Sequence, residues 1–563
     1  MFTVTNTNPS DGVAGSLGAA IDAANATSGG STIVFNISGN GPFTIPFCTA
    51  SANIKQSVVI DATTQPGYKG APVVQLLGAP GNNRLNGFSL IAANAVTIRG
   101  FAITSLALGV YVVVGGNHII EGNYIGTDLA GNIATGLYGD GSAAGVGIEN
   151  SNNVQVGGTT AAARNVISGN LAGVITNVAA TIQGNYIGVN AQGTSAVGNQ
   201  NYGVYGAMNA VIGGTTAGAG NVISANNVSG QAYCGGVRAD AAGQLVQGNY
   251  IGTNAAGTAA LGNHGNGLCP GQIQVGGTTP AARNVISGNT GDGIGGGVGI
   301  VVQGNYVGTG ADGVSPVGNA GHGVSATCCE IIGGTTAGAG NVIAFNGGAG
   351  VLTPPDRDFI RRNSIFSNAT LGIDNGSYQD RGDGVTRNRN CAGTNFPVLT
   401  SAVFTAATTI AGTLNNDSNA SVDIDLFGNA SCDLSGYGQG HTYLGSTTGT
   451  TDSSCNASFD VALPLANWGE PFITATATNV NGPHPVGSST SEFSECLLAP
   501  VPRATLNVGT TQSANPLDTL PASVRVVDSN GNPIAGAPVT FSVRHPPRSG
   551  WLDELGRLKG GRS

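Results

Sequence analysis

Charged residues are scarce in this chain, and their scarcity excludes several functions. Lys and Arg number 20 and Asp and Glu number 29 among 563 residues, which gives a formal net charge of −9. The basic residues form no patch in the sequence. Because proteins bind the phosphate backbone through a basic face, we expect no nucleic-acid partner.

Long apolar runs and familiar catalytic motifs are also missing. No run approaches the roughly 18 apolar residues that a membrane-spanning helix needs, so we expect no transmembrane segment. The sequence contains neither a phosphate-binding loop ending in GKS or GKT nor a GxSxG nucleophile elbow. It starts directly with the strand-like FTVTNTN, without a visible signal peptide. We expect a secreted or cell-surface protein whose signal peptide is missing from this sequence.

Glycine, by contrast, is abundant, with 94 residues, more than twice the usual share of about 7%. A collagen helix would need Gly at every third position, which is not the pattern here. Disorder would need low hydrophobicity and high charge, whereas 40% of the residues are hydrophobic and 9% are charged. The glycines therefore indicate many tight turns in a folded chain.

Two interleaved phrases repeat along the chain. The first, GGTT followed by NVI, recurs at intervals of 56, 63 and 57 residues, counted from Gly157, Gly213, Gly276 and Gly333. The second, GNYIG or GNYVG, recurs at intervals of 62, 64 and 56 residues, counted from Gly122, Gly184, Gly248 and Gly304. Such self-similarity predicts one structural unit that is repeated and stacked.

The repeats predict a coil of short strands. Each phrase has a short β-branched run bounded by Gly, Asn, Thr or Ser, which is a strand signal. The strands lie too close together for helical crossovers, so a parallel β-helix is the remaining arrangement. A coil takes roughly 20 residues, so we expect about three coils in each long repeat. Asparagines at equivalent corners should form ladders of amide hydrogen bonds, as at Asn123, Asn185, Asn249 and Asn305.

Changes in composition divide the chain into five segments. Residues 1–48 predict an N-terminal cap with a helix over Ser16–Ala26, and residues 49–375 predict the β-helix. Residues 376–395 predict a linker, and residues 396–497 alternate with period two, as in an antiparallel β-sandwich. Residues 498–563 begin a similar module that is too short to be complete and ends in an atypical tail.

Several phrases resemble those of a known class of bacterial proteins. NVISGN, GNYIGT and VGGTT resemble the right-handed parallel β-helix repeats of surface and secreted proteins in the pectate-lyase-like superfamily. SLGAAIDAAN, from Ser16, looks like the N-terminal cap often called CSLREAI-type, which usually has SLRQAI or a close variant here. VIDATTQPGY, from Val59, is similar to a phrase that follows in the same proteins. DSNGNPIAG and PVTFSV look like an Ig-like module of the invasin/intimin type, cut short.

This resemblance implies the fold class but no activity. It implies an all-β chain, with a right-handed parallel β-helix solenoid, one β-sandwich domain and a truncated Ig-like module. Most relatives have no assigned chemistry, so function has to be argued from the site.

The nine cysteines form no CxxC pair, so they are either disulfide-bonded or free. They are Cys48, Cys234, Cys269, Cys328, Cys329, Cys391, Cys432, Cys455 and Cys496. In an oxidising compartment we expect disulfides among the C-terminal cysteines, and buried free thiols are the alternative elsewhere. Adjacent strand residues point to opposite faces, so we expect Cys328 and Cys329 not to pair with each other.

Candidate chemistry concentrates where the β-helix is expected to end. The acidic and basic residues there are Asp356, Arg357, Asp358, Arg361, Arg362, Asp374, Asp380, Arg381 and Asp383. Asp374, Asp380 and Asp383 lie among glycines, and they are candidate calcium ligands and, with Arg381, candidate catalytic residues. The alternative is a solvated, charge-paired linker. No other cofactor is expected.

Carboxylates within the coils favour a turn role. Asp128 and Asp312 follow the GNYIGT and GNYVGT phrases, where the other copies have Asn190 and Asn254. A corner that accepts either residue type points away from catalysis.

These observations support one main functional hypothesis. A non-enzymatic secreted or surface protein would use its β-helix as a stalk, an adhesive or a carbohydrate-contacting surface, with extracellular polysaccharide or a host or cell surface as partner. The alternative is an extracellular polysaccharide lyase or glycoside hydrolase acting in a groove of the β-helix; a hydrolase would need paired carboxylates on neighbouring coils. A third hypothesis, glycan or ice binding along a flat Thr/Asn face, rests on the recurring GTT phrases.

Overall fold

The computed structural model describes the chain except for residues 48–51, 79–84, 92, 136–143, 207, 355–357, 377–383, 394, 405–407, 464–469, 481–488, 500–502, 509–521, 528–550, 553–557 and 560–563. The chain divides into two compact units. The solenoid unit comprises Met1–Arg387 and Thr478–Glu492, and the sandwich unit comprises Asn388–Ala477 and Phe493–Ser563.

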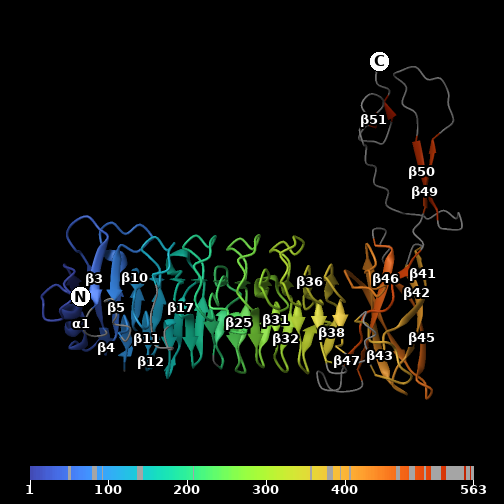
Figure 1. Ribbon diagram of the computed structural model, residues 1–563, viewed down its shortest axis with the longest axis horizontal. Coiled ribbons are helices and arrows are strands. Elements are labelled where there is room, and N and C mark those ends of the chain that lie inside the picture. Colours follow the sequence, from blue (N-terminus) through green and yellow to red (C-terminus); the bar gives the residue numbers. More distant parts are fainter. Residues whose placement is uncertain are drawn as a thin grey trace. The chain divides into compact units, whose positions relative to one another are not determined.

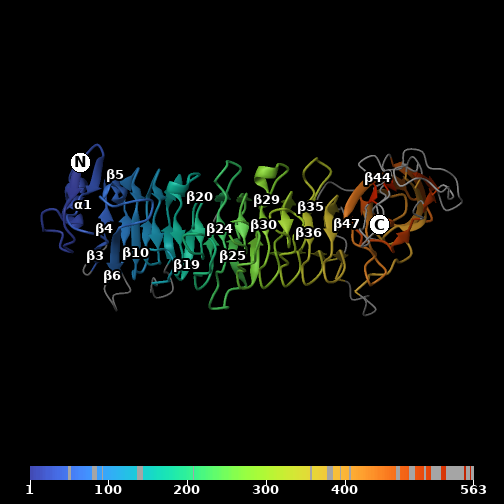
Figure 2. The ribbon, with the colours of Figure 1, turned by 90° about the horizontal axis from the view of Figure 1, so that it is seen from above.

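Three long parallel sheets build the solenoid unit (Figures 1 and 2). In order, the first sheet contains β1 (Phe2–Val4), β2 (Ser31–Phe35), β5 (Val58–Asp61), β9 (Thr97–Arg99), β13 (Ile119–Glu121), β17 (Val154–Gly157), β20 (Ala180–Gln183), β23 (Val211–Gly213), β26 (Leu245–Gln247), β29 (Gln274–Gly276), β32 (Val301–Gln303), β35 (Ile331–Gly333) and β38 (Phe359–Arg361). The second contains β3 (Phe43–Phe47), β6 (Val74–Gly78), β10 (Phe101–Thr104), β14 (Tyr124–Ile125), β18 (Val166–Ile167), β21 (Tyr186–Ile187), β24 (Val222–Ile223), β27 (Tyr250–Ile251), β30 (Val285–Ile286), β33 (Tyr306–Val307), β36 (Val342–Ala344) and β39 (Ser364–Phe366). The third contains β4 (Ala52–Ile54), β7 (Phe88–Leu90), β11 (Val110–Val112), β15 (Ala144–Ile148), β19 (Ala172–Thr176), β22 (Val204–Tyr205), β25 (Cys234–Ala239), β28 (Asn266–Pro270), β31 (Ile294–Gly295), β34 (Val324–Ser325), β37 (Val351–Leu352) and β40 (Ile373–Asp374). A small extra sheet joins β8 (Ala93–Asn94), β12 (Gly115–Gly116) and β16 (Ser151–Asn152).

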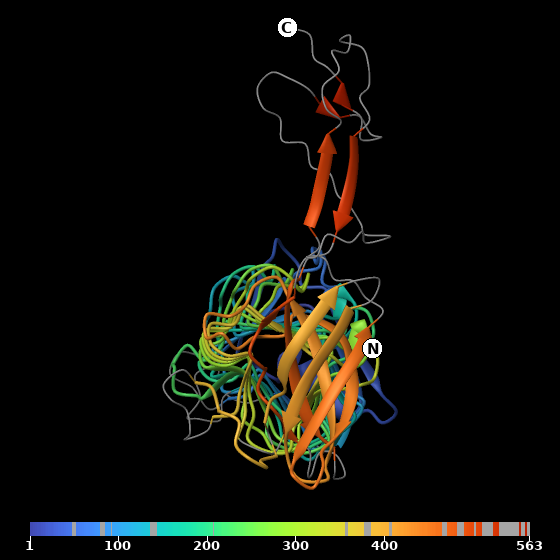
Figure 3. The ribbon, with the colours of Figure 1, turned by 90° about the vertical axis from the view of Figure 1, so that its right-hand side faces the viewer.

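Each coil contributes one strand to each long sheet, as β13, β14 and β15 do in succession. Viewed along the solenoid, successive coils lie over one another (Figure 3). The predicted right-handed parallel β-helix is therefore confirmed. Its core consists of stacked aliphatic side chains, such as Ile125, Ile167, Ile187 and Ile223 in the second sheet, all fully buried.

Two asparagine ladders run along the solenoid, and they explain the repeated phrases. In each ladder the side-chain Nδ2 of one Asn donates to Oδ1 of the Asn on the next coil. The first ladder contains Asn123, Asn165, Asn185, Asn221, Asn249, Asn284, Asn305, Asn341 and Asn363. The second contains Asn170, Asn199, Asn226, Asn263, Asn289, Asn319, Asn346 and Asn368. The predicted ladder is confirmed, with an additional Asn between each pair that the phrases suggested.

The prediction of three coils in each long repeat is wrong, because each repeat forms two coils. Successive members of the first ladder are separated by 42, 20, 36 and 28 residues, from Asn123 to Asn249. The coil of 20 residues has the expected length. The long coils also contain a loop closed by an isolated antiparallel bridge, such as Thr127–Ala134 or Val189–Ala196.

Short helical segments lie at the start and at the corners of the solenoid. Helix α1 (Leu17–Asn25) has Ser16 as its N-cap and buries Leu17 and Ile21, as predicted. It packs against β1, β2 and β4, the first strands of the stack. The 3₁₀ turns η1 (Ala62–Thr64), η2 (Ala161–Ala163) and η3 (Pro280–Ala282) form corners.

The sandwich unit is antiparallel. One sheet contains β41 (Val398–Phe404), β42 (Thr408–Asn415) and β45 (Asn456–Leu463), and another contains β43 (Ser421–Asn429), β44 (Thr442–Thr450), β46 (Phe472–Asn479) and β48 (Leu497–Leu498). Ile410, Ile424 and Phe459 are among its core residues. Farther along lie β49 (Arg503–Val508), β50 (Ala522–Val527), β51 (Trp551–Leu552) and β52 (Leu558–Lys559). These short strand pairs do not establish an Ig-like domain, so that assignment stays a prediction.

Disulfides occur in both units. The sandwich unit contains Cys391–Cys455 and Cys432–Cys496, as expected for the C-terminal cysteines. The solenoid contains Cys234–Cys269 between β25 and β28. It also contains a bond between Cys328 and Cys329, so the expectation that these two would not pair is wrong. The alternation rule does not apply because the pair lies outside the regular strands and Cys329 has φ 67°. Cys48 lies outside the described residues.

Candidate functional site

Of the four site residues predicted at the exit of the β-helix, Asp374 is the one that the structure describes. Asp374 ends β40, and its Oδ1 accepts the Gly376 amide at 2.8 Å, which is a turn contact. Asp380, Arg381 and Asp383 lie outside the described residues. Within the part of the chain that is described, no three His, Cys, Asp or Glu side chains are arranged to hold a metal ion. The calcium site therefore stays a prediction.

One pair of carboxyl groups does lie on neighbouring coils. Glu330 and Asp358 precede β35 and β38, adjacent strands of the first sheet, and the Asp358 Oδ1 accepts the Glu330 amide at 2.9 Å. Burial, together with the hydrogen bond and the charge of Asp358, raises the pKa of Glu330 to about 8. Glu330 is 0% exposed and Asp358 2% exposed. Both side chains are therefore shielded from solvent and from any substrate.

Glu492, a third buried carboxyl group, fixes the segment Thr478–Glu492 to the end of the solenoid. Glu492 accepts the amides of Asn375 at 3.0 Å and Thr386 at 2.9 Å, one with each carboxylate oxygen. Nearby, β47 (Ser489–Thr490) lies against β38, where the Thr490 amide donates to the Asp358 carbonyl at 3.0 Å. Burial raises the pKa of Glu492 to about 7. These contacts are structural and close the last coil.

Nearer the start of the solenoid, two carboxylates share one guanidinium. Arg99 lies between Asp61, at 2.6 Å, and Glu121, at 3.4 Å, on successive strands of the first sheet. Burial raises the pKa of Asp61, but the hydrogen bonds from Arg99 and Thr63 outweigh it and hold the pKa below the usual value. A hydrolase needs one protonated carboxyl as general acid. Asp61 stays ionised, so it does not supply that acid.

The carboxylates after the GNYIG phrases cap turns, as expected. Asp128 Oδ1 accepts the amides of Asn132 and Ile133, and Asn190 and Asn254 do the same in their own loops. In the fourth loop the equivalent position is Gly310, and Asp312 accepts two amides instead. The substitution between Asp and Asn thus reflects backbone capping.

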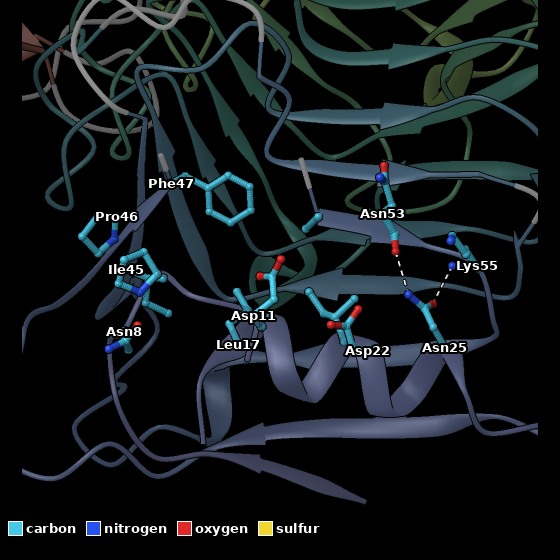
Figure 4. A pocket seen from close by; sticks show the side chains of 14 residues that line it. Asn8, Asp11, Leu17, Asp22, Asn25, Ile45, Pro46, Phe47, Asn53 and Lys55 are labelled. Carbon is cyan, nitrogen blue, oxygen red and sulfur yellow. Dashed lines mark hydrogen bonds between the residues drawn. The ribbon is translucent and has the colours of Figure 1, made fainter. Parts of the chain in front are cut away.

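A pocket of about 170 Å³ lies between helix α1 and the first coil (Figure 4). Its apolar wall includes Leu17, Ile21 and Phe47, and its charged residues are Asp11, Asp22 and Lys55. Asn25 spans one side, donating to the Asn53 carbonyl at 2.9 Å and accepting the Lys55 amide at 2.7 Å. These bonds fasten the cap to the coil.

A different set of side chains is held on the outer face of the third sheet. Tyr205 and Arg238 are paired residues on β22 and β25. The Arg238 guanidinium lies 5.2 Å from the Tyr205 ring centroid and 5.6 Å from that of Tyr202. Its Nη1 donates to the Tyr202 hydroxyl at 2.9 Å, and its Nε lies 2.6 Å from Asp240 Oδ2. We call these four residues the tyrosine–arginine cluster.

The tyrosine–arginine cluster is both rigid and accessible. The Arg238 and Asp240 side chains are 40% and 43% exposed, and both tyrosines are half-buried. The strand next to Arg238 contains Cys269, which is bonded to Cys234 on the same strand as Arg238. Ring stacking, a charge-assisted hydrogen bond and this crosslink fix the side chains before any ligand arrives.

Sequence reasoning missed this cluster. Its members belong to two segments that join when the coils stack, and none lies in a repeated phrase. The local signals are two close pairs, Tyr202 with Tyr205 and Arg238 with Asp240, and neither pair shows that the other is near.

Comparisons with known proteins are limited. No family model matches the chain, and no curated protein matches it in sequence. Among solved structures, a mutant tailspike protein of E. coli bacteriophage HK620 in complex with a pentasaccharide is 10% identical, with a TM-score of 0.26, over 88% of this chain and 94% of that one. The gp42 tailspike of an Acinetobacter phage is 10% identical, with a TM-score of 0.20, over 92% and 81%. Likenesses this low support no functional argument.

One further finding concerns membranes. Among the residues that the structure describes, no helix is long and apolar enough to span a bilayer.

Proposed function

We propose that this chain is a non-enzymatic, secreted or cell-surface β-helix protein that contacts carbohydrate with the outer faces of its solenoid. The tyrosine–arginine cluster supports this proposal most directly. A sugar ring presents an apolar C–H face that packs on aromatic side chains, and its hydroxyls can pair with Arg238 and Asp240. A stiff rod that displays such a cluster is suited to adhesion.

The alternative, a polysaccharide lyase or hydrolase in a groove of the β-helix, receives less support. Glu330 and Asp358 are sealed from solvent, and Asp61 and Glu121 are tied to Arg99. Asp374 caps a turn. Each of these described carboxyl groups is thus either buried or already held by an ion pair or a turn hydrogen bond.

Glycan binding by the cluster can be tested with a panel of neutral polysaccharides. We expect Tyr205→Ala and Arg238→Gln each to weaken binding about tenfold, because an aromatic or charged contact contributes about 1–2 kcal/mol. Tyr443→Ala in the sandwich unit is the matched control and should bind as the unmodified protein does. Equal binding by all variants would contradict the role of the cluster.

The same panel tests for enzymatic activity. Incubation with pectins, alginates and neutral glycans should release no products. A turnover that Asp358→Asn, Asp374→Asn or Glu121→Gln abolishes would replace the proposal with the enzymatic alternative.

A further inference from the structure

One position on the solenoid is occupied by glycine on six coils and by arginine on three. It directly precedes each Asn of the first ladder, at the corner where the chain passes from the first sheet to the second. The residues at this position, called the corner row, are Gly122, Arg164, Gly184, Gly220, Gly248, Arg283, Gly304, Gly340 and Arg362.

Arg164 and Arg283 have the same conformation. Each follows a 3₁₀ turn, with φ −63° and ψ 124° at Arg164 and φ −63° and ψ 126° at Arg283. The Nε of Arg164 donates to the Gly184 carbonyl at 3.1 Å, and the Nε of Arg283 donates to the Gly304 carbonyl at 3.0 Å. Two segments far apart in sequence therefore build the same arginine site.

A tyrosine supports each guanidinium. The Arg164 guanidinium lies 4.2 Å from the ring centroid of Tyr186, and that of Arg283 lies 4.1 Å from the ring centroid of Tyr306. Stacking and the Nε bond restrict the side chain, so little entropy is lost when a ligand binds.

The terminal nitrogens of both arginines have no partner among the residues that the structure describes. Among the described residues, no carboxylate is ion-paired with Arg164 or Arg283, and no acceptor is hydrogen-bonded to their Nη atoms. Both side chains are half-buried. A fixed guanidinium with two free Nη groups is suited to a planar carboxylate or a sulfate.

A second tyrosine precedes each arginine in the sheet. Tyr124 on β14 and Tyr250 on β27 complete two units, Tyr124–Arg164–Tyr186 and Tyr250–Arg283–Tyr306. Burial raises the pKa of Tyr124, and the charge of Arg164 opposes part of this effect. In the second sheet, each arginine is thus followed by a stacked tyrosine and preceded by a tyrosine on the strand before.

The spacing of the two units requires an extended ligand. They are four strands apart in the second sheet, from β18 to β30. Strands are about 4.8 Å apart, so the two arginines are separated by roughly 19 Å along the solenoid. A small anion reaches one arginine, whereas a polymer with repeated anionic groups reaches both and gains from the second contact.

We infer that the corner row binds an acidic polysaccharide, with one carboxylate or sulfate on Arg164 and another on Arg283. This inference rests on the proposed function in that the ligand is a glycan, but it concerns another face and a charged ligand. Nucleic acid fits less well, because Arg164 and Arg283 lie four strands apart and the row lacks the dense positive charge that a phosphate backbone attracts. Arg362 extends the row, with its Nη1 donating to the Thr335 carbonyl at 3.0 Å.

Polygalacturonate is a suitable probe, with carboxyl-reduced polygalacturonate as the neutral control. We expect binding that weakens with salt, a loss of about tenfold for Arg164→Gln or Arg283→Gln, and a larger loss for the double variant. Short oligomers that cannot span both arginines should respond to each single variant less than the polymer does. Lys55→Gln, which removes an exposed cation outside both proposed binding sites, should leave polygalacturonate binding unchanged.

Two further variants test the inference even if the Gln substitutions disturb the fold of the solenoid. Arg164→Lys and Arg283→Lys retain the charge without the planar guanidinium, and they should fall between the unmodified protein and the Gln variants. Circular dichroism and thermal unfolding confirm that each variant is folded.

The outcomes separate this inference from the proposed function. Polygalacturonate binding that is unchanged in the Arg164 and Arg283 variants would overturn the inference. It would not affect the proposal for the tyrosine–arginine cluster on the third sheet. Tighter binding of duplex DNA than of polygalacturonate would also overturn the inference. If no glycan binds at all, neutral or acidic, the proposed function fails as well.

Discussion

Asn221 illustrates how much a single ladder residue stabilises. Its Oδ1 accepts the amide and Nδ2 of Asn185, at 2.9 and 3.0 Å, and its Nδ2 donates to the Ile182 carbonyl at 2.8 Å and to Asn249 Oδ1 at 2.9 Å. The residue is fully buried. Removal of the side chain leaves buried donors and an acceptor without partners, and each such group costs about 1–3 kcal/mol.

We therefore expect Asn221→Ala to lower the free energy of unfolding of the solenoid by about 3 kcal/mol. Urea unfolding followed by circular dichroism measures this change. Asn40 is exposed, so Asn40→Ala serves as the control and should change stability by less than about 0.5 kcal/mol. Similar values for both variants would show that the ladder contributes little.

At the same scale, the sequence predicted the ladders but not the buried acid pair. An Asn repeated in one phrase is visible because each copy occupies the same corner. Glu330 and Asp358 occur once each, 28 residues apart, and become neighbours only because the coil between them has that length. Coil length depends on loops that have no fixed size, so such single contacts cannot be deduced from the repeat.

Among the elements, the strands were predictable and the coil count was not. NYI and NVI place their residues in the same register, in which Tyr186 pairs with Val166, and Ile187 pairs with Ile167 in the core. The two phrases therefore mark alternate coils, and the inserted loops account for the extra residues. The tyrosine–arginine cluster was equally hidden, since Tyr205 and Arg238 meet only through strand register.

The segment that closes the last coil should respond to pH through Glu492. Its pKa is about 7, above the ordinary 4.5, because burial disfavours the charged form and the charge of Asp374 adds to this effect. The folded state thus binds the proton more tightly than the unfolded state does. The stabilisation is complete below about pH 4.5 and is lost as the pH rises to about 7, by about 3 kcal/mol at most.

Amide hydrogen exchange at Asn375 and Thr386, the two donors to Glu492, measures this opening. We expect exchange protection to fall between pH 5 and pH 7, beyond the intrinsic change in exchange rate, and Glu492→Gln to remove most of that fall. Glu330 acts in the same direction at higher pH, with a pKa of about 8. Protection that rises with pH at these two amides would contradict the assignment.

At the scale of the whole molecule, the two units are stabilised by different interactions. The solenoid unit has continuous ladders of main-chain and Asn hydrogen bonds, and its Cys234–Cys269 bond joins strands that are already paired. The sandwich unit has two disulfides, Cys391–Cys455 and Cys432–Cys496, each linking residues 64 positions apart. Closure of a loop of that length stabilises a fold by about 4 kcal/mol in the chain-entropy description.

Reduction should therefore separate the unfolding of the two units. Calorimetry of the oxidised protein should show the sandwich transition, and dithiothreitol should lower its midpoint by well over 10 °C, because a domain of about 100 residues shifts about 4–8 °C per kcal/mol. The solenoid transition should move by a few degrees, and Cys234→Ser with Cys269→Ser is the control for that smaller effect. If reduction moved both transitions equally, crosslinks rather than stacked coils would dominate the stability of the solenoid, and the ladder argument would lose its basis.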